Sequence, residues 1–143
     1  MLAHGGSVRL EPLIQQLFEE LEMGPLSEKD VIQKNPLTFA LELDEELTLS
    51  LKEEKGAFYM HSAVTTPSPE KEAEVYQRVM EANLFGIETR GARLGLEKEG
   101  KTITLSCDMP EKMDYTAFRD SVEDFVNVVH YWREEIATYS EGA

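Results

Sequence analysis

The apolar residues of this chain follow a helical repeat and a strand repeat in turn, and their order restricts the fold more than any other feature. Six large apolar residues from Leu10 to Leu21 recur every three or four positions, which places them on one face of a helix. Gly24 and Pro25 should end this helix, because glycine accepts a left-handed cap and proline cannot continue the helix. The first predicted element is therefore an amphipathic helix.

Three strands are predicted next. Apolar residues occupy every second position over 39–43 and 47–51, and in a third strand over 57–64 the side chains of Phe58, Met60 and Ser62 would share one face. Asp44-Glu45-Glu46 is a natural hairpin connection between the first two, and the third should follow Gly56. Together they predict a three-stranded meander.

A second helix is predicted from Ser68-Pro69-Glu70 to about Asn83, since this tripeptide supplies an N-cap, a first-turn proline and an acid near the positive helix end. A second hairpin follows, with strands around 94–96 and 103–107 and a turn at Glu99-Gly100. Asp114 is the expected N-cap of a last helix whose apolar repeat continues to Ile136.

The predicted order is α-β-β-β-α-β-β-α, with antiparallel hairpins and the helices against one face of the sheet. This is an α+β two-layer domain. We expect a flexible lead-in at residues 1–9, one domain at 10–138 and a C-terminal tail at 139–143.

Charge and composition limit the partners of this domain. The chain has 28 acidic and 14 basic residues, a net charge of −14 and 41% hydrophobic residues. It lacks the cationic surface that nucleic acids and anionic membranes attract, and its apolar content is too high for a disordered acidic tail. The N-terminus resembles no signal peptide, and no apolar stretch has the length of a membrane span, so neither nucleic acid binding nor membrane insertion is expected.

No side-chain pattern predicts catalysis, a metal site or a cofactor. The single Cys107 excludes an internal disulfide and a cysteine-rich zinc site, and it fits a reducing cytoplasm. His4, His61 and His130 are far apart in sequence and lack the spacing of metal ligands. Cys107 could approach His61 in space, but an inward position on a core strand favours an inert thiol. A small enzyme is therefore the weakest hypothesis.

The apolar side chains are more numerous than one sheet face covered by three helices readily accommodates. Two interpretations are open. The surplus is either an ordinary core, or it is divided between a self-association surface and grooves for a partner chain.

Four segments together resemble the class I chaperones of bacterial type III secretion, the Tir chaperone family. They are Val79–Leu84 at the end of the second helix, Gly91–Glu97, Ile103–Leu105 ahead of Met109-Pro110, and the helix from Phe125 to Trp132. With the element order, the resemblance extends over residues 10–136.

This resemblance implies a bacterial cytoplasmic chaperone, not an enzyme, which as a homodimer binds the N-terminal segment of secreted effectors and keeps it secretion-competent without ATP. Contact with the secretion ATPase is left open. The dimer interface would contain Val75, Val79, Leu84, Phe85, Leu94 and Leu96. The partner-binding grooves would contain Leu13, Leu17, Phe18, Phe39, Leu41, Leu49 and Phe58. The alternative is a regulatory or sensory domain of the same fold that binds a folded bacterial protein.

Overall fold

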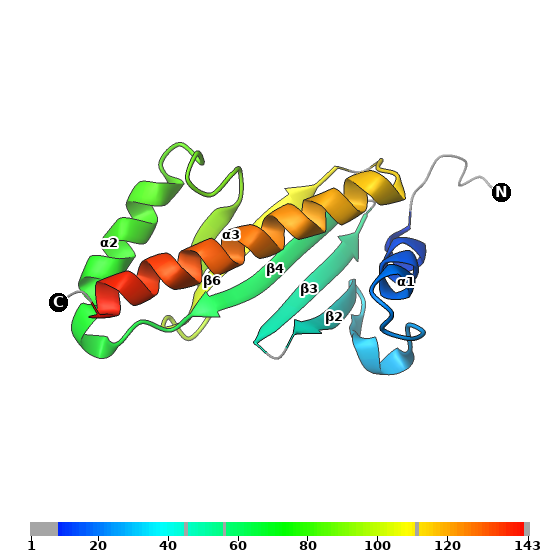
Figure 1. The fold of residues 1–143 in the computed structure, drawn as a ribbon, viewed down its shortest axis with the longest axis horizontal. Helices are drawn as coiled ribbons and strands as arrows, with labels where there is room; N and C mark the ends of the chain where they lie inside the picture. The colour runs from blue at the N-terminus through cyan, green and yellow to red at the C-terminus, as the bar shows by residue number, and fades with distance from the viewer. Residues whose placement is uncertain (1–8, 45, 56, 111, 142–143) are drawn as a thin grey trace. The chain divides into compact units, whose positions relative to one another are not determined.

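The structure of the protein is a computed structural model that describes residues 9–44, 46–55, 57–110 and 112–141 (Figure 1). Glu45 of the predicted hairpin, Gly56, most of the predicted lead-in and the last two residues of the predicted tail lie outside the described residues.

The described residues form three α-helices and six strands, with one short 3-10 turn ahead of the first strand and another ahead of the second helix. In chain order the elements are α1 (Leu10–Glu20), η1 (Glu28–Asp30), β1 (Val31–Lys34), β2 (Leu37–Asp44), β3 (Leu47–Glu54), β4 (Ala57–Thr65), η2 (Pro69–Lys71), α2 (Glu72–Asn83), β5 (Arg93–Leu96), β6 (Ile103–Met109) and α3 (Tyr115–Glu141). The strands hydrogen-bond in the order β1-β2-β3-β4-β6-β5. The pairs β1/β2, β2/β3 and β5/β6 are antiparallel, and the predicted α+β class is confirmed.

Strand β1 is an addition to the predicted order. Val31 is half-buried and the other three residues are exposed, so the strand lacks the apolar alternation by which a buried strand is recognised. It lies at one edge of the sheet, where a strand needs a neighbour on only one side.

The chain forms two compact units. The first contains the described residues up to Met60 together with Asp108–Glu123, and the second contains His61–Cys107 together with the described residues from Asp124 onward. Strands β4 and β6 and helix α3 contribute residues to both units. The expectation of one domain over 10–138 stays a prediction.

In the first unit, α1 and the strands supply a continuous apolar core. Five of the six predicted helix residues are buried, and Leu21 is exposed because it lies just past the helix end. The helix ends earlier than Gly24-Pro25 predicts. Glu22 takes the left-handed conformation (φ 55°), and the N–H of Met23 donates to the carbonyl of Phe18 at 2.9 Å, which completes a Schellman-type cap.

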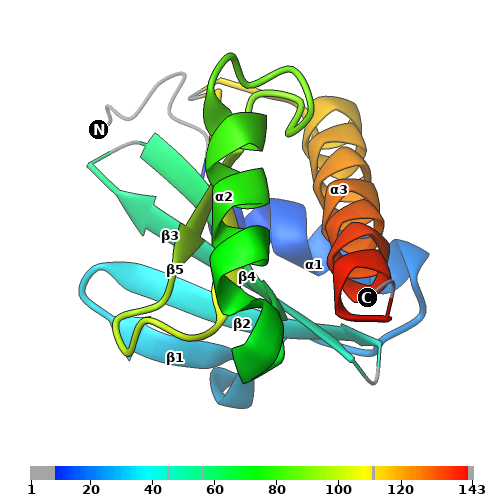
Figure 2. The same cartoon turned by 90° about the vertical axis from the view of Figure 1, so that its left-hand side faces the viewer.

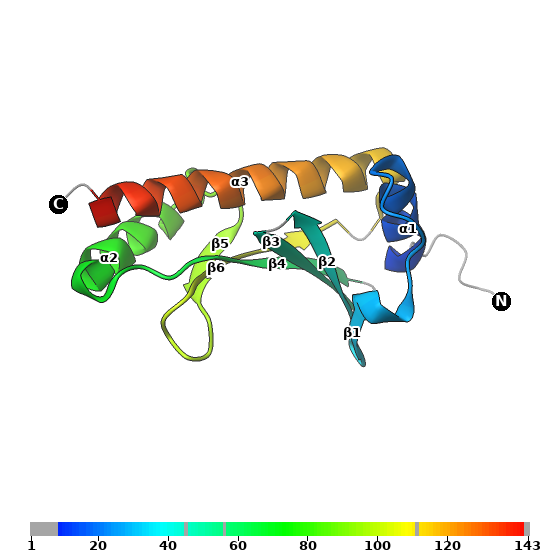
Figure 3. The ribbon, with the colours of Figure 1, turned by 60° about the horizontal axis from the view of Figure 1, so that its bottom comes forward.

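Polar side chains hold both ends of α1 within this unit. Glu53 of β3 accepts hydrogen bonds from the Leu10 N–H and from Arg9 Nε, each at 2.9 Å. Glu20 accepts a hydrogen bond from the hydroxyl of Tyr115, the first residue of α3, and the N-terminal end of α3 lies beside α1 (Figure 3). Burial, together with this bond, raises the pKa of Tyr115 to about 12.

In the second unit, α2 lies beside β5 (Figure 2). Ser68-Pro69-Glu70 begins the turn η2, and α2 itself begins only at Glu72. The predicted N-cap of α3 is confirmed, because Asp114 Oδ1 accepts a hydrogen bond from the Ala117 N–H at 2.9 Å. The helix continues to Glu141, beyond the predicted Ile136.

Candidate interaction surface

Exposed apolar side chains gather at the C-terminal end of α2 and in the loop that follows it. Met80, Leu84, Phe85 and Ile87 are 70–80% exposed, and we call these four residues the α2 apolar surface. The opposite face of the helix is apolar too, with Val75, Val79 and Ala82 buried. The helix thus has one face for the core of its own unit and another that presents apolar side chains to solvent.

An open hollow of about 520 Å³ extends along this exposed face. Its lining consists of Ala73, Tyr76, Gln77, Met80, Glu81 and Leu84. These positions are spaced by three, one, three, one and three residues, which is one face of a single helix. The lining comes from α2 and from Leu84, the residue that caps the helix, so the hollow is open on the side away from the helix. Large exposed apolar patches of this kind mark interaction sites.

The loop that carries Phe85 and Ile87 is held by its own hydrogen bonds. The buried hydroxyl of Thr89 donates to the carbonyl of Ala92 at 2.7 Å, and the Gly91 N–H donates to the carbonyl of Gly86 at 2.9 Å. Gly86 and Gly91 both take positive φ, where a Cβ would cause strain. The apolar side chains of the loop therefore project from a defined backbone.

Arg78 of α2 fixes the same loop to α3. Its guanidinium forms two hydrogen bonds with the Glu88 carboxylate, at 3.1 and 2.5 Å, and pairs with Glu135 at 3.0 Å. The hydrogen bonds to Glu88 raise the pKa of Arg78, and those from Arg78 lower the pKa of Glu88. The Trp132 indole N–H donates to the Glu88 carbonyl at 3.3 Å, so both the backbone and the side chain of Glu88 are held by hydrogen bonds.

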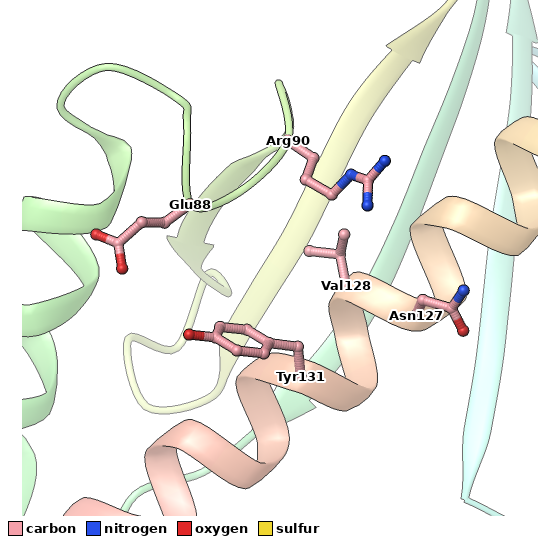
Figure 4. Close-up of a pocket in the computed structure, with 5 residues that line it drawn as sticks. All are labelled: Glu88, Arg90, Asn127, Val128 and Tyr131. Carbon is pink, nitrogen blue, oxygen red and sulfur yellow. The ribbon is translucent and has the colours of Figure 1, made fainter.

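A smaller pocket of about 250 Å³ lies between the loop and α3 (Figure 4). Its lining is Glu88, Arg90, Asn127, Val128 and Tyr131. Val128 lies between the Arg90 side chain and the Tyr131 ring, so the pocket has an apolar base flanked by a cation and an aromatic ring. Its lining contains no Ser, Thr, Cys, Lys or His side chain.

The predicted dimer-interface residues divide into two groups. Leu84 and Phe85 belong to the α2 apolar surface, and Leu96 on β5 is 47% exposed. Val75, Val79 and Leu94 are buried within the chain itself. The pattern alone did not separate the two groups, since both faces of α2 carry apolar residues. Their role in a dimer stays a prediction.

The predicted groove residues all lie in the core of the first unit. Leu13, Leu17, Phe18, Phe39, Leu41, Leu49 and Phe58 are at most 7% exposed. In this conformation they stabilise the unit, and a partner chain could contact them only after they were uncovered. The exposed large apolar residues that the structure describes in this unit are Leu21, Met23 and Ile32. The partner-binding role of the seven stays a prediction.

Sequence reasoning placed none of Met80, Ile87, Arg78 and Asn83 in a predicted interface or groove, although Met80 and Asn83 lie in the Val79–Leu84 segment that carries the family resemblance. One signal could have found part of the surface: Leu84, Phe85 and Ile87 are three apolar residues in a loop, where polar residues are usual. Arg78 and Asn83 carried no signal, since their partners come from distant parts of the chain.

The residues weighed for catalysis lie apart from this surface in the sequence. His61 on β4 has its Nδ1 atom 3.0 Å from the Ser106 hydroxyl, and Cys107 is half-buried. Across the described ranges, no group of three or more His, Cys, Asp or Glu residues could hold a metal ion. No helix in the part of the chain that the structure describes is both long and apolar enough to cross a membrane.

Solved structures similar to this chain share its fold at low sequence identity. A structure described as "Crystal Structure of the ExsC-ExsE Complex" matches with a TM-score of 0.70 and 10% identity, over 87% of this chain and 90% of the other. A structure of the heterodimeric complex ExoU-SpcU from the type III secretion system of Pseudomonas aeruginosa matches with a TM-score of 0.62 and 12% identity, over 94% of this chain and 100% of the other. A structure of the HopA1-SchA chaperone-effector complex matches with a TM-score of 0.62 and 17% identity, over 86% of this chain and 91% of the other.

Comparison with curated protein sequences gives no significant match. The family comparison does give one. Residues 12–133 match the Tir chaperone protein (CesT) family, and the chain therefore belongs to this family.

Proposed function

We propose that this protein is a cytoplasmic chaperone of bacterial type III secretion. As a homodimer it binds an N-terminal segment of one or more secreted effectors and keeps that segment soluble and competent for secretion, without ATP. The match of residues 12–133 to the Tir chaperone family carries the proposal. The structural similarity to chains from the ExoU-SpcU and HopA1-SchA complexes supports it. No catalytic step is part of this function.

The α2 apolar surface is the proposed interface with the second chain of the homodimer. A twofold interface uses the same patch on both chains, and a helix face without an opposite wall fits that requirement. Met80 and Leu84 are one helical turn apart, so they can form a continuous ridge against the same ridge of the partner. Each chain carries a net charge of −14, so apolar burial must outweigh the repulsion between the two chains.

The effector segment would bind in extended form, with main-chain hydrogen bonds supplying affinity and side-chain contacts supplying selection. Ordering such a segment costs on the order of 2–5 kcal/mol or more, so wide contact is needed. The acidic surface favours segments with basic residues. Binding by mass action alone would keep the segment from folding or aggregating.

Edge strand β1 is the accessible place for that segment in the first unit. Ile32 is 60% exposed on this strand, and β1 has a strand neighbour only on the β2 side. Adding a strand here needs no change in the core, whereas contact with the seven buried groove candidates would need α1 or the strands to separate. We therefore place the first contact of the effector at β1.

Affinity purification from the native bacterial lysate tests this function, with the whole chain as bait and light scattering on the eluted complex. The expected result is a secreted protein retained through its N-terminal segment by two chaperone chains. Ile32→Asp should weaken retention, and Gln33→Asp is the matched control, because it adds the same charge at the next exposed position of β1. Retention of only a folded, full-length cytoplasmic protein would support the regulatory alternative instead.

A further inference from the structure

The side chain of Asn83, at the end of α2, is bonded to both backbone groups of one residue of β5. Its Nδ2 atom donates to the Leu94 carbonyl at 2.7 Å, and its Oδ1 atom accepts from the Leu94 N–H at 2.9 Å. A primary amide can make this pair of bonds because it carries a donor and an acceptor side by side. It satisfies Leu94 as the backbone of a neighbouring strand would.

Leu94 lies on the outer strand of the sheet. β5 is the last strand in the order β1-β2-β3-β4-β6-β5, and it pairs with β6 alone. In an antiparallel strand, the backbone groups of successive residues face alternate sides. Since those of Leu94 face Asn83 rather than β6, those of Leu96 face outward as well, and the Glu97 N–H bonded to the Thr102 carbonyl at 3.0 Å agrees with this alternation.

An open strand edge is a template for pairing with another chain. This sheet has two different edges, β1 and β5, so a β5 edge that paired with the β1 edge of a second copy would leave one edge free at each end. Such a contact does not close and can propagate into long assemblies. The half-exposed Leu96 on β5 and Ile32 on β1 would add apolar contact to the pairing.

We propose that Asn83 closes the β5 edge against strand pairing with a second copy of this chain. β5 is four residues long, and only Leu94 and Leu96 present backbone groups outward. With Leu94 already bonded, one residue remains, which is too little for a ladder of hydrogen bonds. This role does not use the α2 apolar surface, although Leu94 and Leu96 also belong to the predicted dimer interface, so every variant below is compared with the mass of the wild-type protein.

The test replaces the Asn83 side chain and then blocks the edge in another way. Asn83→Ala removes both hydrogen bonds, and alanine favours the helix at this position. Leu96→Pro removes the one other outward N–H of β5 without removing a bond to β6, a position at which an edge strand tolerates proline. Wild type, each single variant and the double variant are compared by light scattering over a dilution series, with amide hydrogen exchange at Leu94.

We expect Asn83→Ala to assemble into species whose mass is a multiple of the wild-type mass and rises with concentration. The double variant Asn83→Ala/Leu96→Pro should return to the mass of the Leu96→Pro single variant. Wild-type mass for a folded Asn83→Ala protein whose Leu94 amide has lost protection would overturn the proposal. Assembly that Leu96→Pro does not reverse would also overturn it, because it would use a different surface.

Asn83→Ser provides the test if the alanine variant does not fold. The serine side chain is shorter than that of asparagine, and its single hydroxyl cannot bond to both the N–H and the carbonyl of Leu94. The substitution therefore exposes the same strand edge. The proposal is supported if the folded Asn83→Ser protein assembles and if adding Leu96→Pro to it restores the mass of the Leu96→Pro single variant. A folded serine variant of wild-type mass with faster exchange at Leu94 overturns it.

Discussion

The guanidinium of Arg78 lies over the ring of Trp132, with its central carbon 5.0 Å from the ring centroid. The same group binds the carboxylates of Glu88 and Glu135, so one cation joins α2, the following loop and α3. This arrangement sets the position of the loop that carries three of the four residues of the α2 apolar surface.

Arg78→Ala should destabilise the protein by about 1–3 kcal/mol, because it removes a partly buried, charge-assisted hydrogen-bond network and a cation–π contact. Urea unfolding followed by circular dichroism measures the effect. Arg78→Lys is the matched control, since it keeps the charge but cannot bind Glu88 through two nitrogens. Equal stability of wild type and the alanine variant would show that the network contributes nothing.

Acid should weaken this network through Glu88. Its pKa is lowered in the folded protein by the hydrogen bonds from Arg78, so the ionised form adds stability above the unfolded value of about 4.3. That stability is lost as the pH falls through the lower folded pKa. Wild type should therefore lose more stability than Glu88→Gln in urea unfolding between neutral and acid pH. Parallel pH profiles for the two proteins would contradict the assigned shift.

Phe85→Asp should weaken self-association and leave the unfolding midpoint close to that of wild type, because this side chain is exposed in the single chain. Sedimentation velocity at several concentrations measures the first effect, and urea unfolding in dilute, monomeric solution measures the second. Ala137→Asp, at an exposed position of α3, adds the same charge away from the α2 apolar surface. An unchanged dimer in Phe85→Asp would remove this residue from the interface.

Salt should strengthen the dimer. Two chains of charge −14 repel each other, and ions screen this repulsion, with a screening length of about 10 Å at 0.1 M salt. The dissociation constant measured by sedimentation should therefore fall between low and moderate salt. The opposite trend would indicate an interface that depends on ion pairs rather than on apolar contact.

Leu49→Ala should cost about 2–5 kcal/mol of unfolding free energy, because Leu49 is fully buried on β3 and its truncation leaves a cavity. Ile32→Ala, at the exposed edge, should change stability by less than about 0.5 kcal/mol. Chemical unfolding of both variants separates core residues from surface residues. If the Leu49→Ala protein were as stable as wild type, this side chain would not belong to the core, and the prediction that it lines a partner-binding groove would be favoured.

The repeats in the sequence were sufficient to predict most of the helices and strands. Leu10, Leu13, Ile14, Leu17 and Phe18 recur at helical spacing and are all buried in α1, and Asp114 caps α3 as its position suggests. Strand β1 and the end of α1 escaped the same reasoning, because an exposed edge strand has no apolar alternation and a Schellman cap can form at Glu22 without glycine.

The periodicity of apolar residues shows which of them share a face, but it does not show what covers that face. Val79 and Met80 are neighbours in one helix, yet the first is buried and the second is exposed. In the sequence, Asn83 is an ordinary polar residue at a helix end. Its role depends on Leu94, which lies eleven positions further along the chain and belongs to another element. Local spacing thus determined the elements, while contacts between distant segments determined which apolar residues form the core and which remain free for a partner.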